Sequence, residues 1–112
     1  SQHIWVYDWS PNGLGDPRPF CVLPAGFPDG FCFTADGQLI VCGSLGDLIC
    51  VYDRDGQLVE RFDAPAHSEP TNCCIGDGKL YVTYSGPGQL VAFDCDWKPL
   101  PLYPERAGGR AG

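Results

Sequence analysis

The chain has 112 residues, enough for one small domain, and contains fifteen glycines, eleven prolines and no methionine. These residues interrupt helices too often for a helical protein, while the aromatic and β-branched content is too high for a disordered one. The few basic residues are scattered singly, the formal net charge is −7, and no apolar run is as long as a membrane span. We therefore expect a β-rich domain that binds neither nucleic acid nor a membrane.

The first 27 residues predict half of a four-stranded unit. The segment HIWVYDWS (3–10) matches the later strand ICVYDRD, and FCVLPAGFP (20–28) matches the later segment RFDAPAHSEP. The insertion PNGLGDPRP between them lengthens a loop, and its Asn12-Gly13 pair is typical of a β-turn. The chain is thus expected to begin in the middle of a repeat.

Two full units follow. The segments TADGQLIVCGSLGDLICVYDRDGQLVERF (34–62) and IGDGKLYVTYSGPGQLVAFDCDWKPLPLY (75–103) align at a constant offset, which places Val41 on Val82 and Asp53 on Asp94. Each reads as short strands separated by turn residues, and a repeat of about 40 residues with four strands is typical of a β-propeller blade. We predict an all-β partial β-propeller: a half blade at 1–27, blades at 28–69 and 70–104, and a tail at 105–112.

The seven cysteines are an odd number and include no C-x-x-C pair. Most lie inside strand-like runs, so reduced thiols that pack as small apolar groups fit better than a disulfide framework or a zinc site. This use of cysteine indicates a reducing compartment, and we expect the protein to be cytoplasmic.

Each full unit begins with a proline-containing segment that we interpret as a turn: Pro28-Asp29-Gly30 in the first and Pro70-Thr71-Asn72 in the second. Aspartate is common in turns because its side chain bonds nearby backbone. In the second unit, however, Thr71 occupies the position that Asp29 occupies in the first. The turn itself therefore does not require a carboxylate. A carboxylate facing the ring axis would suit a hard cation that takes oxygen ligands.

These segments resemble the SMP-30/gluconolactonase (regucalcin-like) lactonases, six-bladed propellers with one divalent cation at the centre of the ring. The resemblance rests on IWVYD, GFPDGFCFTADGQLIV, PTNCCIGDGKLYVTYSGPGQLVAFD and the closing LPLYP, and covers nearly all of residues 3–103. It implies that this chain corresponds to the C-terminal portion of such a propeller.

The resemblance also implies a site. Asp29 would be a metal ligand and the general base, Thr71 and Asn72 would line the substrate pocket, and the cofactor would be one divalent cation, calcium or zinc. The family's other ligands, a glutamate near the N-terminus and an asparagine of an N-G-L turn, have no matching position, because Asn12 lies in a different loop. The implied function is metal-dependent hydrolysis of a lactone once the ring is completed.

Strand counting leaves a second possibility open. About two and a half blades cannot close a ring, so the edges must be covered by something else. We expect a homo-oligomer, most simply a dimer, or the missing blades of a propeller. The alternative to a lactonase is then a noncatalytic module that assembles through its exposed blade edges.

Overall fold

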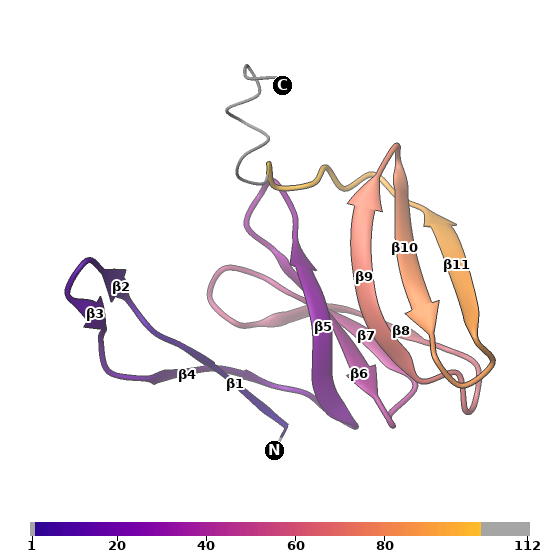
Figure 1. The fold of residues 1–112 in the computed structure, drawn as a ribbon, viewed down its shortest axis with the longest axis horizontal. Coiled ribbons are helices and arrows are strands. Elements are labelled where there is room, and N and C mark those ends of the chain that lie inside the picture. The colour runs from indigo at the N-terminus through magenta and orange to yellow at the C-terminus, as the bar shows by residue number, and fades with distance from the viewer. Residues whose placement is uncertain (1, 102–112) are drawn as a thin grey trace.

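The computed structural model describes residues 2–101, which form eleven strands and no helix, so the all-β prediction is confirmed (Figure 1). The strands are β1 (His3–Val6), β2 (Trp9–Ser10), β3 (Gly13–Leu14), β4 (Arg18–Val22), β5 (Phe27–Phe33), β6 (Leu39–Ser44), β7 (Leu48–Tyr52), β8 (Leu58–Asp63), β9 (Pro70–Gly76), β10 (Lys79–Tyr84) and β11 (Gln89–Asp94). Within residues 2–101 there is no helix of the length and apolarity that crossing a membrane requires.

Two antiparallel sheets make up the body of the molecule. The first has the strand order β5-β6-β7-β8 and the second the order β9-β10-β11. In the first, Val41 of β6 pairs with Phe31 on one side and Cys50 on the other. In the second, the repeat-equivalent Val82 pairs with Cys73 and Val91. Both sheets run up and down in sequence order, as propeller blades do, and β5 lies beside β9 (Figure 1).

Strands β6 and β7 are buried on both faces, which explains their continuous apolar sequences LIVCG and LICVY. One face packs against β9 and β10 in a core between the two sheets, formed by Ile40, Cys42, Ile49, Val51, Cys73, Leu80, Val82 and Tyr84. The other face packs against the N-terminal unit in a second core, formed by Cys21, Leu23, Leu39, Val41, Leu48, Cys50 and Tyr52. Alternate side chains of one strand therefore serve two different interfaces.

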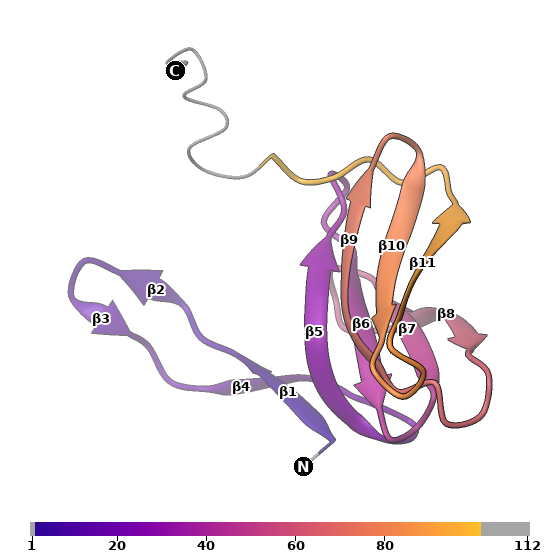
Figure 2. The same ribbon diagram turned by 45° about the vertical axis from the view of Figure 1, so that its right-hand side comes forward.

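The N-terminal unit is a two-stranded sheet of β1 and β4. It is fastened to the first full sheet by the Tyr52 hydroxyl, which donates a hydrogen bond to the Val22 carbonyl at 3.1 Å. The predicted long loop contains a short hairpin, β2 and β3, which extends away from the packed sheets (Figure 2). An exposed ion pair between Asp8 and Arg18 at 3.0 Å lies at its base.

The end of the second repeat differs from the prediction. In place of a fourth strand beside β11, the described chain crosses back to the first sheet, where Pro99 forms a bridge with Thr34 and the Ala35 amide donates to the Lys98 carbonyl at 2.7 Å. Pro99 and Pro101 lack the N–H that a strand uses to pair, which weakens this segment as a fourth strand. Residues 102–104 of the predicted blade and the predicted tail lie outside the described residues.

All seven cysteines are free thiols. Four are buried as predicted: Cys21, Cys42, Cys50 and Cys73. Cys74 is exposed, because neighbouring residues of a strand point to opposite faces. The four buried thiols therefore belong to the two cores.

Candidate functional site

Asp29 lies in a β-bulge, so the prediction of a turn at this position is wrong. Pro28 pairs with Gly43 and Phe31 pairs with Val41, so Asp29 and Gly30 together oppose the single residue between those partners. The strand continues through the bulge from Phe27 to Phe33. A bulge bends the strand and redirects the side chain it carries, and bulges are frequent next to active sites.

The second proline segment has the same construction. Pro70 pairs with Tyr84 and Asn72 pairs with Thr83, which leaves Thr71 as the extra residue of β9. Thr71 thus occupies the bulge of its blade as Asp29 occupies the bulge of the preceding blade. The turn propensity of Pro, Asp and Gly in the first segment, and of Pro and Asn in the second, favours a turn at both places in the sequence.

The two bulges lie against each other. A β-carbon placed on Gly30 would collide with Asn72 Oδ1 and lie 2.5 Å from the Thr71 carbonyl oxygen. Only glycine allows β9 to approach β5 this closely. The structure therefore brings Asp29, Thr71 and Asn72 together on adjacent strands, although 42 residues separate Asp29 from Thr71 in the sequence.

Hydrogen bonds hold the β9 side of this site. The Thr71 and Thr83 hydroxyls are 2.8 Å apart, and the Cys73 amide donates to Asn72 Oδ1 at 2.9 Å. Thr83 was not identified as a site residue from the sequence, although it belongs to the LYVT segment on which the resemblance partly rests. Its role here is to orient Thr71.

Asp29 itself is exposed, and within residues 2–101 its carboxylate has no hydrogen bond or ion pair. The aromatic residues two positions away on either side, Phe27 and Phe31, are also exposed on β5. The site is consequently an open, aromatic-flanked face with one free carboxylate.

Two thiols lie in contact between β5 and β9, next to the site. Cys32 Sγ and Cys73 Sγ are 3.6 Å apart, joining β5 to β9. The hydrogen bond to Cys73 and burial raise the pKa of Cys32. The hydrogen bond with Cys32 lowers the pKa of Cys73, but that with Cys42 and burial outweigh it and raise the value to about 12. Both thiols are therefore neutral at physiological pH and act as packing groups.

The oxygen atoms of the site suit a hard cation only in part. Asp29 offers a carboxylate and Thr71 and Asn72 offer neutral oxygens, which are the ligand types that calcium prefers. Within residues 2–101, however, no group of three or more His, Cys, Asp or Glu side chains is placed to hold a metal ion. These residues can therefore supply part of the ligand set of a cation, and other residues must supply the remaining ligands.

The fold and site define a segment of a β-propeller with a carboxylate on the inner strand of one blade and polar residues on the inner strand of the next. The chain belongs to the SMP-30/Gluconolactonase/LRE-like family, whose model matches residues 1–86. The resemblance stated from the sequence is thereby confirmed.

Relatives of known function share this region. An L-arabinolactonase from Azospirillum brasilense is 33% identical over 90 residues, which cover 78% of this chain and 30% of that protein. Regucalcin from Xenopus laevis is 32% identical over 77 residues, 65% of this chain and 24% of that protein. The structure of a gluconolactonase from Xanthomonas campestris superimposes with a TM-score of 0.67 at 33% identity, covering 87% of this chain and 30% of the other. The chain thus spans about a third or less of the length of these relatives.

Proposed function

We propose that this chain supplies part of the catalytic centre of a metal-dependent lactonase, which is active when further blades complete the ring. The observation that carries the proposal is the meeting of the two bulges, in which Gly30, the residue after Asp29, lies directly against Thr71 and Asn72. Membership of a family that contains lactonases supports it.

In this proposal Asp29 has two tasks. It contributes one ligand to a divalent cation, calcium or zinc, and it accepts the proton of the water that attacks the lactone carbonyl. A bound cation would polarise that carbonyl and lower the pKa of the water. Asp29 suits proton transfer because it is exposed and has no competing partner among the described residues.

Thr71 and Asn72 are proposed to bind the substrate. Asn72 Oδ1 and the Thr71 carbonyl oxygen lie beside Gly30 in the bulge that carries Asp29. The Thr71 hydroxyl is held by the Thr83 hydroxyl at 2.8 Å. We propose a sugar lactone as the substrate class, since two of the relatives are named for the lactones of arabinose and gluconic acid. Hydroxyl and amide side chains are appropriate partners for the hydroxyl groups of such a ring.

A chimaera tests the proposal. The corresponding C-terminal segment of the Xanthomonas campestris gluconolactonase would be replaced by this chain, and gluconolactone hydrolysis would be followed by acid release with added calcium or zinc. We expect activity that a chelator removes. Asp29→Asn should lower kcat/KM about 100-fold or more, because the base and a ligand are lost together.

Asp55→Asn is the matched control, since Asp55 is an exposed carboxylate in the turn between β7 and β8. It should change kcat/KM less than twofold. A folded chimaera that is inactive, or one in which Asp29→Asn and Asp55→Asn behave alike, would refute the assignment of Asp29.

We also propose a cytoplasmic location. The support is the set of seven free thiols, four of them in the two cores, a pattern typical of a reducing compartment. Labelling of the thiols in intact cells before lysis would detect any that are oxidised in place.

A further inference from the structure

The loop that leads into β9, residues 64–69, has a strained backbone. His67 and Glu69 both have positive φ, 64° and 52°, although neither is glycine. Glu69 also precedes Pro70, and a residue before proline favours an extended conformation. In the corresponding loop before β5, the positive φ belongs to a glycine, Gly26, at 72°. Strain of this kind persists only where the surrounding structure holds it, and it is frequent at functional sites.

The turn between β6 and β7 contains a second strained position. Asp47 in this turn has a φ of 52°, and the repeat places Gly88, with a φ of 70°, at the same position of the second sheet. Glycine adopts such a conformation without strain, whereas aspartate does not. An aspartate where the other blade has glycine indicates that the carboxylate itself is needed.

The Asp47 carboxylate holds the two strained residues of the loop. Its Oδ2 accepts a hydrogen bond from the His67 amide at 2.8 Å, and its Oδ1 accepts one from the Glu69 amide at 2.9 Å. On the other side, the amide and the hydroxyl of Ser85 donate to the Glu69 carbonyl at 3.0 Å and 3.2 Å. Glu69 is thus held at its amide by the first sheet and at its carbonyl by the second.

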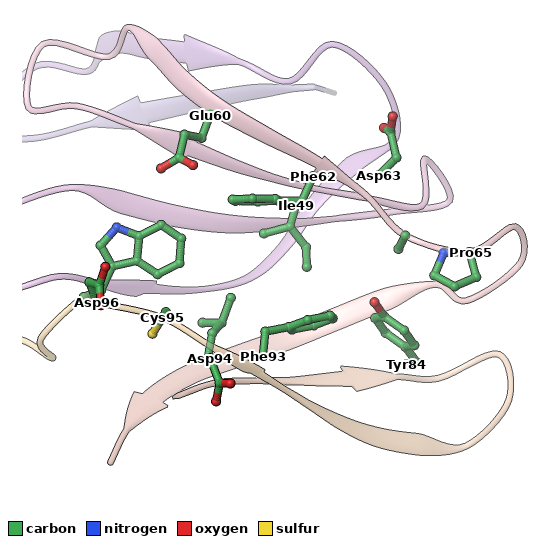
Figure 3. Close-up of a pocket in the computed structure, with 13 residues that line it drawn as sticks. Ile49, Glu60, Phe62, Asp63, Pro65, Tyr84, Phe93, Asp94, Cys95 and Asp96 are labelled. Atoms are coloured by element: carbon green, nitrogen blue, oxygen red, sulfur yellow. The ribbon is translucent and has the colours of Figure 1, made fainter. Parts of the chain in front are cut away.

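The first part of the loop is held differently. Pro65 and Ala66 are exposed, and Pro65 lines a cavity of about 550 Å³ between the two sheets, whose lining also includes Tyr84 (Figure 3). The Ala64 amide donates to the Asp47 carbonyl at 2.8 Å. Because this bond involves only backbone atoms, a change of the Asp47 side chain should alter the end of the loop and leave its start attached.

The end of the loop is directly connected to the candidate site. Only Pro70 separates Glu69 from Thr71, and Pro70 is buried, pairs with Tyr84 and has a φ fixed by its ring. A change in the conformation of Glu69 is therefore passed on to the bulge at Thr71. The β6–β7 turn and the loop before β9 lie at the same end of the two sheets, where β5 and β9 begin (Figure 1).

We propose that Asp47 is a positioning residue for the substrate site: its carboxylate holds the loop in the strained form that places Thr71 and Asn72 to bind a sugar lactone. This inference rests on the proposed function, in which those two residues bind the substrate. Without the carboxylate the loop relaxes and substrate binding weakens, while the reaction at Asp29 is unaffected. Such a change raises KM and leaves kcat unaltered.

Two glycine variants of the same turn test the role of the carboxylate. Asp47→Gly removes the carboxylate and relieves the strain, whereas Leu45→Gly relieves a φ of 65° and leaves the carboxylate in place. In the chimaera with gluconolactone, Asp47→Gly should raise KM about three- to tenfold and change kcat less than about twofold. Leu45→Gly should change neither value more than about twofold. Asp47→Asn keeps one acceptor oxygen and should raise KM less than Asp47→Gly.

A second measurement does not use activity. In amide nitrogen–proton NMR spectra of the full chain, Asp47→Gly should shift the signals of the loop and also those of Thr71 and Asn72. Leu45→Gly should leave the signals of Thr71 and Asn72 in place. The Tm of Asp47→Gly should fall less than that of Asp47→Ala, because glycine accepts the positive φ. A large effect on KM with a small effect on Tm distinguishes positioning from a purely structural role.

The two measurements separate this inference from the proposed function. An inactive chimaera refutes the proposed function, and the spectra then still decide whether Asp47 sets the conformation of Thr71 and Asn72. In an active chimaera, an unchanged KM in Asp47→Gly, or an equal change in Leu45→Gly, would overturn the assignment of Asp47. Spectral changes that end at Glu69 would overturn it in either case.

Discussion

Gly30 of β5 packs directly against Asn72 of β9. A β-carbon on residue 30 would lie 2.6 Å from Asn72 Cα, a backbone atom that cannot move without displacing the strand. We predict that Gly30→Ala destabilises the fold by about 1 to 3 kcal/mol, as overpacking does. Urea unfolding followed by circular dichroism measures the change.

Gly76→Ala in β9 is the matched control. The nearest atom to a β-carbon at that position is Tyr81 Cε2 at 4.0 Å. The substitution should leave stability unchanged or raise it by up to about 1 kcal/mol, because alanine restricts the unfolded chain. Equal effects of the two substitutions would mean that β5 and β9 do not approach each other as described.

Asp47 holds the loop between β8 and β9. Its carboxylate accepts hydrogen bonds from the His67 amide at 2.8 Å and the Glu69 amide at 2.9 Å. Both donors have a left-handed backbone, with φ of 64° and 52°, which costs free energy unless it is stabilised. Asp47→Ala should therefore lower Tm, measured by a thermal scan, whereas Asp36→Ala in another exposed turn should not.

The effect of Asp47 should depend on pH. The amide of Glu69 and then that of His67 lower the pKa of this carboxyl below its ordinary value. The folded-state pKa is thus below the unfolded one of about 3.9, so the stabilisation is present above that pH and is lost as pH falls through the folded-state pKa. The Tm difference between the natural chain and Asp47→Ala should be constant from pH 6 to 8 and shrink below about pH 4. A difference that grows on acidification would contradict this assignment.

Tyr52 fastens the N-terminal unit to the first sheet. Its hydroxyl donates to the Val22 carbonyl at 3.1 Å, and the ring is almost fully buried. Tyr52→Phe should cost about 1 kcal/mol, the usual net value of one hydrogen bond. Tyr84→Phe is the control, because that hydroxyl has no hydrogen bond within residues 2–101. An equal loss of stability in both variants would mean that the hydrogen bond to Val22 is not the cause.

The thiols should differ sharply in reactivity. Cys74 is exposed, whereas burial and then the neighbouring Cys50 raise the pKa of Cys21 to about 11. The hydrogen bond with Cys32 lowers the pKa of Cys73, but the hydrogen bond with Cys42 and burial outweigh it and raise the value to about 12. At pH 8 a thiol of pKa about 11 is ionised in only about one molecule in a thousand, and the thiolate is the reactive form. With Ellman's reagent we expect one fast-reacting thiol in the native chain, absent in Cys74→Ser, and all seven after unfolding. Two fast phases that survive Cys74→Ser would show that a core opens readily.

The repeat made much of the fold predictable. The offset that places Val41 on Val82 also places β6 on β10, and the structure pairs these strands with their neighbours in the same way. The register of the innermost strands could not be predicted in the same way. Pro28-Asp29-Gly30 has the residues typical of a turn, and it forms a bulge only because β5 pairs with β6 on both sides of it. Nothing local to Pro99 shows that it bridges Thr34, since that contact joins segments far apart in the sequence. The nearness of Asp29 to Asn72 was implied by the repeat, while the hydrogen bond that orients Thr71 depends on the bulge.

The sharing of β6 and β7 between two cores also sets the order in which the backbone opens. Amide protons in these strands exchange with solvent only when both neighbouring layers separate, so their exchange should report global unfolding. The hairpin of β2 and β3, which extends away from the packed sheets, should exchange within the dead time of the same measurement. The middle of the chain is thus the last part to open, and the N-terminal hairpin the first.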